Sequence, residues 1–491
     1  MSLPAATSSL LAQRRAGVLL HPTSLPGAGA NGTLGAAAFR FIDFLSEAGF
    51  SIWQTLPLGP VDEFHSPYSL SSAFAGDIRL IDPAVLAELP QLPRKLPLEC
   101  LHRDPTVLYR AFVATAAPEQ AAGFEVFMQR HRHWLLPFAL FERYTKQFDG
   151  RTWWKWPSQY ADCEHRFLFS KFADDEQVYL AFAFRQYLFD LQWSAVKQRA
   201  NERNISVFGD LPFYVDRNSA DVWWRRDLFA LDDDGEPLAV SGVPPDYFSE
   251  DGQLWGNPLY DWEAMKADGF QWWRRRLKFQ LERFDLLRID HFRALESYWS
   301  IPADAQSAKD GHWVPGYGDE LLEAVSEGGT LPLVAEDLGI ITAAVRELRD
   351  RHGLPGMAVV QFGFDGAPDN PHLPGNVTEH TVLYTGTHDN NTLLGWYRSL
   401  DEGARGYVAQ ALAVEPQELP QCIVRIALES RANLVVIPFQ DLLGLGSDAR
   451  MNTPGKSRGN WDWRFDWDQV DETLAPDMRR LLNETGRQGA K

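Results

Sequence analysis

The sequence predicts an α/β fold, a (β/α)8 barrel of the TIM type with insertions between its strands. Eight short apolar runs end in polar or turn residues, and segments with helical spacing lie between several of them. The order along the chain is strand then helix, which calls for a parallel sheet. The chain has 491 residues, well above the roughly 250 residues of a plain barrel. We therefore expect a barrel that carries additional segments.

The eight apolar runs have strand length and are rich in Leu, Val and Ile, which is typical of strands buried in a parallel sheet. They are Gly17–His21, Ser51–Leu56, Ile205–Asp210, Leu286–Asp290, Leu331–Glu336, Met357–Phe362, Val382–Thr387 and Leu434–Pro438. The predicted helices include Ala37–Ala48, Glu263–Phe284, Ala343–His352 and Cys422–Ala432. After the third of these helices, Gly353 and Pro355 form the expected C-terminal stop signal.

Insertions are expected in two places. About 150 residues separate the second and third strands, too many for one helix, which predicts a mainly helical insertion over about 85–195. A second insertion, over about 211–280, separates the third and fourth strands. Its stretch 231–262 is dense in Gly, Pro, Asp and aromatic residues, and we expect a long ordered loop there on the C-terminal face of the barrel. No internal repeat or Pro/Ser-rich linker is visible, so one barrel over 1–491 is expected.

The composition argues against several classes of partner. A formal net charge of −19 repels phosphate backbones and anionic lipid, so we expect neither nucleic acid nor a membrane as partner. The cysteines, Cys100, Cys163 and Cys422, lie far apart without C-x-x-C spacing, which argues against a disulfide framework and a zinc cluster and fits a reducing cytoplasm. The first residues lack a long apolar stretch behind a basic start, so no secretory signal is expected.

Three of the predicted strands run into acidic clusters: LLRIDHFRA (286–294), LPLVAEDLG (331–339) and VLYTGTHDN (382–390). They offer Asp290, Glu336 and Asp389 at the C-terminal edge of the sheet, where barrel enzymes perform their chemistry. Arg288 and Asp290 are two residues apart on a strand, so their side chains share one face, and the Arg charge keeps Asp290 ionised. An ionised carboxylate is suited to act as a nucleophile and a carboxyl with a raised pKa as an acid, for which Glu336 is the candidate. This division of labour is typical of a retaining glycosidase.

Other interpretations stay open at this point. Any one of the carboxylates could be a helix cap or the partner of a neighbouring Arg. His388 and Asp389, with His21 and His291, could bind a metal ion and make the chain a metal-dependent hydrolase, although the first strand lacks the H-x-H spacing usual in such barrels. No G-x-G-x-x-G or G-x-x-x-x-G-K-[ST] motif occurs, so no nucleotide cofactor is expected. The 18 Trp residues hint at carbohydrate, because indole stacks on sugar rings, although indole is also a large core residue.

Five motifs stand out along the chain: GDLP (209–212), RIDHFR (288–293), AEDLG (335–339), TGTHDN (385–390) and, most specifically, PPDYFSEDGQLWGNPLY (244–260). They closely resemble motifs of the 4-α-glucanotransferases, also called amylomaltases or disproportionating enzymes. Further similarity includes LLHPTSLPG (19–27), SPYSLSSAFAGD (66–77), LGLGSDARMNTPG (443–455) and GNW (459–461), so the resemblance spans nearly the whole chain.

The resemblance implies a barrel of the α-amylase clan with helical insertions on its C-terminal face and no C-terminal β-domain. Asp290 would be the nucleophile, Glu336 the general acid/base, and Asp389 the carboxylate that holds the 2- and 3-hydroxyls of the sugar. The implied substrate-binding residues are the supporting Asp210, Arg288 and His388, the stacking Tyr68, the groove loop 241–262 with Tyr247, Phe248, Gln253 and Trp255, and Asn460 with Trp461 on the other side of the groove. No metal or cofactor is implied.

The implied activity is transfer of α-1,4-glucan segments between maltodextrins, with maltodextrin, amylose or glycogen as donors and glucose or maltose as acceptor. We expect a monomer or a weak homodimer. Hydrolysis would use the same carboxylates, and an inactive carbohydrate-binding protein is a further alternative that the intact carboxylates argue against. The chain departs from the family pattern at Glu63 and His65, which puts accessory glucan contacts in doubt, and at Asn218 and Ala294, away from the carboxylates.

Overall fold

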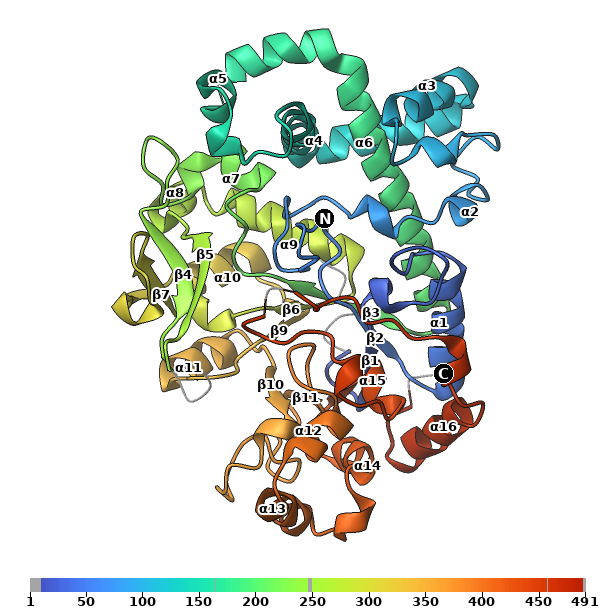
Figure 1. The fold of residues 1–491 in the computed structure, drawn as a ribbon, viewed down its shortest axis with the longest axis vertical. Coiled ribbons are helices and arrows are strands. Elements are labelled where there is room, and N and C mark those ends of the chain that lie inside the picture. The colour runs from blue at the N-terminus through green and yellow to red at the C-terminus, as the bar shows by residue number, and fades with distance from the viewer. Residues whose placement is uncertain (1–9, 164, 246–249, 457, 489–491) are drawn as a thin grey trace.

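The computed structural model describes residues 10–163, 165–245, 250–456 and 458–488. Its centre is a parallel sheet in the order β10-β11-β12-β1-β2-β3-β6-β9, surrounded by helices (Figure 1). The Ala335 N–H donates to the Pro355 carbonyl at 2.9 Å, which joins the two ends of this order. The predicted (β/α)8 barrel and all eight of its strands are confirmed. The strands are β1 Arg15–Leu19, β2 Ile52–Gln54, β3 Ser206–Leu211, β6 Leu286–Ile289, β9 Leu333–Ala335, β10 Gly356–Val359, β11 Thr381–Tyr384 and β12 Leu434–Pro438.

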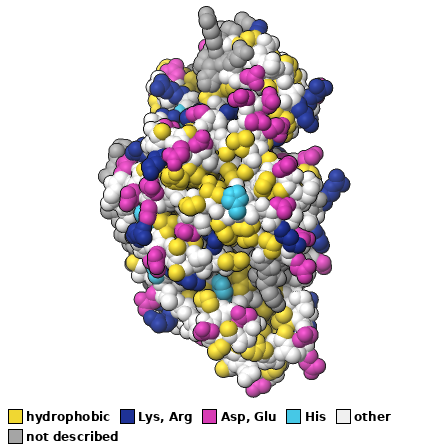
Figure 2. Space-filling model, turned by 90° about the vertical axis from the view of Figure 1, so that its left-hand side faces the viewer, with side chains coloured by type: hydrophobic (Ala, Val, Ile, Leu, Met, Phe, Trp, Pro, Cys, Tyr) yellow, Lys and Arg dark blue, Asp and Glu magenta, His cyan; other side chains and the backbone are white. Residues whose placement is uncertain are grey.

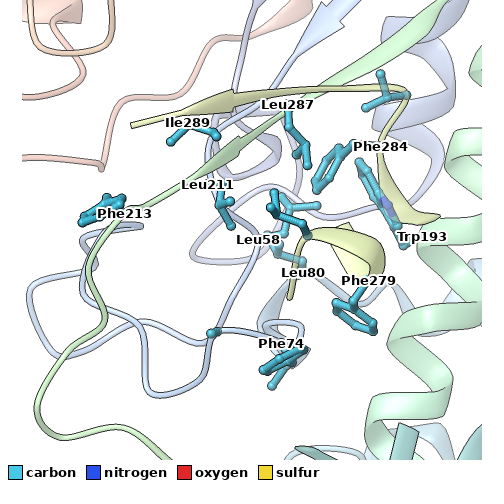
Figure 3. Close-up of a cluster of buried hydrophobic side chains, with 14 of the residues drawn as sticks. Leu58, Phe74, Leu80, Trp193, Leu211, Phe213, Phe279, Phe284, Leu287 and Ile289 are labelled. Carbon is cyan, nitrogen blue, oxygen red and sulfur yellow. The ribbon is translucent and has the colours of Figure 1, made fainter. Parts of the chain in front are cut away.

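Two hydrophobic cores stabilise the barrel. The inner core fills the barrel with side chains from its strands and the residues beside them: Leu19, Ile52, Leu56, Phe208, Leu286, Val334, Met357, Val359, Val382, Tyr384, Leu434 and Val436. The outer core packs the helices onto the strands, and Figure 3 shows the part where β3 and β6 meet Trp193, Phe279 and Phe284. Gly209 of β3 is required at this contact, because a Cβ there would lie 2.4 Å from the Phe284 ring.

Helices surround the barrel on its outer face. Beyond the helices of the long segment between β2 and β3, they are α1 Ala36–Ala48, α7 Ala220–Trp224, α8 Trp262–Ala267, α9 Gln271–Arg283, α10 Gly318–Ser326, α11 Ala343–Arg351, α12 Leu393–Ser399, α13 Glu402–Leu412, α14 Cys422–Glu429, α15 Phe439–Leu442 and α16 Leu474–Glu484. In the part of the chain that the structure describes, no strand follows β12. No described helix has both the length and the apolar character needed to cross a membrane.

The segment between β2 and β3 is helical, and its helices α3 to α6 lie above the central strands in the view of Figure 1. Its long helices are attached through buried polar contacts: Gln186 exchanges hydrogen bonds with the backbone of Gly76, and the Trp193 indole N–H donates to the Arg283 carbonyl at 3.0 Å. The segment contains α2 Pro83–Leu86, α3 Pro105–Thr115, α4 Pro118–Gln147, α5 Ser158–Ala161 and α6 His165–Glu202.

The structure corrects two expectations between β3 and β9. The stretch 231–262, expected to be one long loop, contains β4 Ala239–Val243 and β5 Gln253–Pro258, which form an antiparallel sheet with β7 Ser297–Pro302 and β8 His312–Pro315 in the order β5-β4-β7-β8. β4 and β5 pair with each other, and β4 also pairs with β7 from beyond β6, so local turn signals alone suggested a loop. The predicted helix Glu263–Phe284 is two helices, α8 and α9, because Gly269 (φ 69°) and Phe270 (φ 55°) adopt left-handed backbone conformations.

Candidate active site

Asp290 and Glu336 are neighbours at the C-terminal edge of the barrel. In the register of β6 and β9, Ile289 lies opposite Ala335, and the two carboxylates each follow directly. The Asp290 N–H donates to the Leu211 carbonyl at 3.0 Å, and the Glu336 N–H donates to the Ile289 carbonyl at 3.1 Å. The ladder therefore continues one residue past each strand and holds both backbones in place beneath the carboxylates.

Arg288 connects two of the site's carboxylates. Its guanidinium donates to both oxygens of Asp210 at 2.9 and 2.8 Å and contacts Asp290 Oδ1 at 2.8 Å. The side chains of Arg288 and Asp210 are 7% and 0% exposed, so this pairing is shielded from water. Burial opposes the charge on Arg288, but Asp210 and Asp290 outweigh it and raise the Arg288 pKa well above its ordinary value. A permanent positive charge thus stands beside Asp290, as the sequence suggested.

Glu336 lies in a different environment. Its carboxyl accepts hydrogen bonds from the backbone N–H groups of His291 at 2.7 Å and Leu338 at 2.9 Å. Burial raises the pKa of Glu336 to about 7, against the lowering effect of Arg288 and together with the raising effect of the Asp290 charge. A carboxyl with this pKa is available as a proton donor near neutral pH.

Asp389 forms the third part of the site with His388 and Tyr68. Asp389 Oδ2 lies 3.4 Å from His388 Nε2, and Oδ1 accepts a 2.6 Å hydrogen bond from Asn452. Burial favours the neutral carboxyl, but His388 and these hydrogen bonds outweigh it and hold the Asp389 pKa well below its usual range. Burial lowers the His388 pKa, and Asp389 more than reverses this, so the net shift is upward. The two form an ion pair whose carboxylate is 48% exposed and faces the open site.

Tyr68 lies between the Arg288–Asp210 pair and the His388–Asp389 pair and contacts both. Its hydroxyl donates to Asp210 Oδ2 at 2.7 Å and lies 3.5 Å from His388 Nδ1. Its ring stacks on the His388 ring with centroids 5.0 Å apart. Trp461 lies against the same pair, 6.1 Å from the Tyr68 ring and 5.8 Å from the His388 ring. Five residues predicted from distant segments, Tyr68, Asp210, Arg288, Asp290 and His388, are therefore in one contact network.

Residues after β12 support the third carboxylate. The Arg450 guanidinium donates to the Asp389 carbonyl at 2.5 Å, beside the Asn452 contact. No role had been predicted for either residue, although both lie in the segment 443–455 that carried part of the family resemblance. Asn460, predicted to bind substrate, is buried and uses its amide internally: it accepts from the Thr453 N–H at 2.9 Å and donates to the Lys456 carbonyl at 2.7 Å. Its contacts therefore shape the segment that carries Trp461.

The antiparallel sheet forms another side of the site. Trp255 on β5 is 39% exposed, and its ring packs edge-on against the His291 ring with centroids 4.8 Å apart. Gln253 accepts a hydrogen bond from the Trp255 indole at 3.1 Å. Figure 2 views the molecule from the side that carries β4, β5 and β7, where hydrophobic side chains gather near the middle of the face. Tyr247 and Phe248, predicted for the same loop, lie outside the described residues.

The alternative metal site has no ligand group in the described ranges. No group of three or more His, Cys, Asp or Glu side chains is placed there to hold a metal ion. His21, one of the four candidate ligands, bonds instead to Thr23 Oγ1 at 2.7 Å and to the Pro57 carbonyl at 3.2 Å. Among the described residues, the four candidate ligands are therefore not gathered into one group.

Comparisons with known proteins place the chain in one family over nearly its whole length. A family model described as 4-alpha-glucanotransferase matches residues 20–469. The chain is 45% identical to the 4-alpha-glucanotransferase of Thermus thermophilus over 96% of this chain and 99% of that protein, and 42% identical to that of Synechocystis over 97% and 99%. Amylomaltase from Streptococcus agalactiae, solved in complex with acarbose, superposes with a TM-score of 0.90 at 33% identity, covering 97% of this chain and 100% of that one. Amylomaltase from Corynebacterium glutamicum, at 17% identity, a TM-score of 0.74 and coverage of 99% and 77%, shares the fold.

Proposed function

We propose a mechanism and a substrate class for this chain, which belongs to the 4-α-glucanotransferase family: it transfers α-1,4-glucan segments between maltodextrins by a retaining double displacement. The observation that carries the proposal is the contrast between two neighbouring carboxyl groups. Asp290 is held against the permanent charge of Arg288, whereas burial raises the pKa of Glu336 to about 7. One is suited to attack as an anion, and the other to donate a proton.

In the first step, Asp290 attacks the anomeric carbon of the donor glucan. Glu336 gives its proton to the glycosidic oxygen as the C–O bond breaks, so the segment on the reducing-end side leaves with a free hydroxyl. The other segment is left as a β-glucosyl ester of Asp290. In the second step, the Glu336 carboxylate takes the proton from a 4-hydroxyl of an acceptor glucan. That oxygen attacks the anomeric carbon, the ester bond breaks, and Asp290 returns as a carboxylate.

The remaining residues hold the sugar. Asp389 is anionic and half exposed, which suits it to accept hydrogen bonds from the 2- and 3-hydroxyls. Tyr68, fixed by its hydroxyl and by His388, offers a ring for stacking at the cleavage site. Asp210 and His388 position Arg288 and Asp389, respectively. Gln253 and Trp255, with Tyr247 and Phe248, would line the groove in which the acceptor binds.

We further propose how the chain is organised around this reaction. Residues 1–491 are one catalytic barrel, with an insertion subdomain over about 85–195 and a second insertion over about 211–280 whose segment 241–262, which includes β5, binds glucan. The donors are maltodextrin, amylose or glycogen, and the acceptor is a shorter glucan, maltose or glucose. The protein acts in the cytoplasm as a monomer or weak homodimer.

Incubation with maltotriose, followed by chromatography, tests the reaction. Disproportionation gives glucose and a ladder of longer maltodextrins, and the same chromatogram reports cyclic glucans. Glucose and maltose without longer products would identify a hydrolase and refute transfer. A crystal structure gives a second test, because retaining enzymes place the two carboxyl groups about 5–5.5 Å apart. A separation of about 6.5–9.5 Å between Asp290 and Glu336, as in inverting enzymes, would contradict the double displacement.

Removal of metal ions by a chelator distinguishes the proposed transferase from a metal-dependent hydrolase. We expect full activity after exhaustive treatment with EDTA, since the side chains described above account for each role in a glycosyl double displacement. Loss of activity that zinc or manganese restores would instead favour the metallohydrolase and reassign His21, His291, His388 and Asp389 as ligands.

A further inference from the structure

The segment that follows Asp290 is bonded repeatedly to the loop that carries Glu336. The His291 N–H donates to the Glu336 carboxyl at 2.7 Å, and the Phe292 N–H donates to the Glu336 carbonyl at 3.1 Å. The Arg293 guanidinium donates to the carbonyl of Ile340, four residues further along that loop. The first two bonds are made by the backbone, and the third depends on a side chain.

Arg293 is oriented by an aromatic ring. It is 7% exposed, and its guanidinium lies over the ring of Trp313 at 3.7 Å from the centroid. Trp313 comes from β8 of the antiparallel sheet, where it contacts Trp299 with ring centroids 5.0 Å apart. A planar guanidinium can lie flat on an indole while its edge donates to a carbonyl, which a lysine ammonium cannot do.

Beyond Glu336, the loop is held by packing of the partly buried Leu338 and Ile341 against the cores and by polar contacts at Asp337 and Ile340. At Asp337, the carboxylate is bound by Arg349 of α11 at 2.5 Å and accepts from the Met357 N–H at 2.7 Å. At Ile340, the side chain is 52% exposed, and the apolar packing at this end of the loop comes from its neighbour Ile341. The bond from Arg293 adds a polar restraint on the backbone at the end of the loop that faces the antiparallel sheet.

We propose that Arg293 is a positioning residue that fixes Glu336 relative to Asp290, with Trp313 holding the guanidinium in the required plane. The inference rests on the proposed function, in which Glu336 is the acid/base and Asp290 the nucleophile. Arg293 acts through the loop and does not contact the reacting atoms. A misplacement of a catalytic group by about 1 Å costs on the order of 100-fold in rate, so a restraint on this loop acts on turnover more than on substrate binding.

The protonation of Glu336 gives a readout that a purely structural role would leave unchanged. The charged groups that face its carboxyl are Arg288 and Asp290, and its hydrogen-bond donors are the His291 and Leu338 N–H groups. The raised pKa of Glu336 comes mainly from burial. A loosened loop admits water, which moves this pKa back toward the ordinary carboxyl value and brings the alkaline limb of the rate profile to lower pH.

The test compares Arg293→Met and Arg293→Lys with the wild type and with Arg346→Met, a matched change at an exposed arginine of α11. We expect Arg293→Met to lower kcat for maltotriose disproportionation about 10- to 100-fold, with KM within about twofold and the alkaline limb of kcat/KM at lower pH. Arg293→Lys should recover part of kcat, and Arg346→Met should match the wild type. An unmoved limb in Arg293→Met, with activity reduced only in proportion to the folded fraction, would overturn the proposal.

If Arg293→Met fails to fold, variants of Trp313 test the same restraint, because its ring lies against the Arg293 guanidinium. Trp313→Ala should shift the pH limb in the same direction with a smaller loss of kcat, and Trp313→Phe, which keeps a ring under the guanidinium, should restore most of it. Identical profiles for Trp313→Ala and the wild type would refute the role of the ring. If the wild type only hydrolyses maltotriose, the proposed transfer fails, while the same variants still test Arg293 on the hydrolytic rate.

Discussion

A buried arginine lies at each end of the barrel, and the two have opposite kinds of partner. Arg288, at the C-terminal ends of the strands, is bound by the carboxylates of Asp210 and Asp290. Arg487, at the N-terminal ends of β1 and β12, is fully buried and donates to backbone carbonyls. The carbonyls belong to Leu428 at 2.6 Å, Ala432 at 2.8 Å, Ser430 at 2.9 Å, Arg15 at 3.0 Å and Asn433 at 3.3 Å.

The two environments move the arginine pKa in opposite directions. Burial lowers the pKa of Arg487 to about 9, with a further lowering from the charge of Arg14. Around Arg288 the carboxylates outweigh burial, and the pKa is raised. At one end of the barrel, the arginine is surrounded by carboxyl groups, and at the other it is surrounded by neutral carbonyls that belong to different chain segments. The same residue type serves reactivity at the first end and stability at the second, as expected for the two faces of such barrels.

Asp290→Asn should show most strongly that activity depends on the C-terminal end of the barrel and stability on the other end. An amide keeps an oxygen for Arg288 but cannot attack the anomeric carbon, so we expect transfer to fall by roughly 10⁴-fold or more. Glucan binding should survive, and the melting temperature should stay close to that of the wild type. Product chromatography and thermal melts measure the two effects. Appreciable turnover in a folded Asp290→Asn protein would mean that the nucleophile lies elsewhere.

Arg487→Met should have the reverse effect. It removes all the hydrogen bonds of the buried guanidinium, although Arg14 still donates to the Leu428 and Ser430 carbonyls and the Arg15 N–H to that of Asn433. We expect a loss of roughly 3–5 kcal/mol in the free energy of unfolding, with kcat per folded molecule unchanged. Denaturant unfolding and activity at low temperature measure this. The control is Arg480→Met on α16, whose side chain is 69% exposed. A loss of kcat without a loss of stability would contradict this division of roles between the two ends of the barrel.

Glu336→Gln tests whether the reactive end reduces stability. Because the folded protein raises the Glu336 pKa from 4.5 to about 7, ionisation is unfavourable in the fold, and the penalty grows as pH rises between these values. Below pH 4.5 the group is neutral in both states and the penalty is absent. The stability of Glu336→Gln relative to the wild type should therefore improve by up to about 3 kcal/mol between pH 4.5 and pH 8. Thermal melts at both pH values check this, and a constant difference would contradict the raised pKa.

Trp255→Ala should give the smallest effect, a few-fold rise in hydrolysis relative to transfer. Loss of the exposed ring beside His291 weakens retention of the acceptor glucan and admits water to the intermediate. Leu254→Ala is the matched control, because Leu254 is also exposed but points to the opposite face of β5. Tyr247→Ala should act like Trp255→Ala. An equal product ratio in Trp255→Ala and Leu254→Ala would leave Trp255 with a packing role.

Much of the barrel and its reactive edge follows from local sequence. A strand buried on both faces needs a continuous apolar run, and a carboxylate directly after such a run must lie at the sheet edge, so Asp290 and Glu336 could be placed without a structure. The pairing of Arg288 with Asp290 follows from their spacing of two on one strand. Its second partner, Asp210, lies on a neighbouring strand, and that choice depends on the strand order.

Other features depend on contacts between distant segments. The strands of the antiparallel sheet are short and partly exposed, and β4 pairs with β7 from beyond β6, so no local period identifies them. The break between α8 and α9 was missed because Phe270, an apolar residue within a helical pattern, adopts a left-handed conformation. Arg487 has no sequence signal at all, since its acceptors are backbone carbonyls that any residue provides. The role of Asn452 depends on its position beside Asp389.

The pairing of β1 with β12 has a consequence for the time course of folding. Arg15 lies opposite Leu434, so one edge of β1 cannot be paired until roughly 400 further residues have been synthesised. At the usual rate of about 5–20 residues per second, this takes on the order of 20 to 80 s. During that interval β1 presents unpaired N–H and C=O groups that other nascent chains can bind. The pairing of β1 with β12 is the longest-range strand pairing of the barrel, and non-local pairings of this kind slow folding.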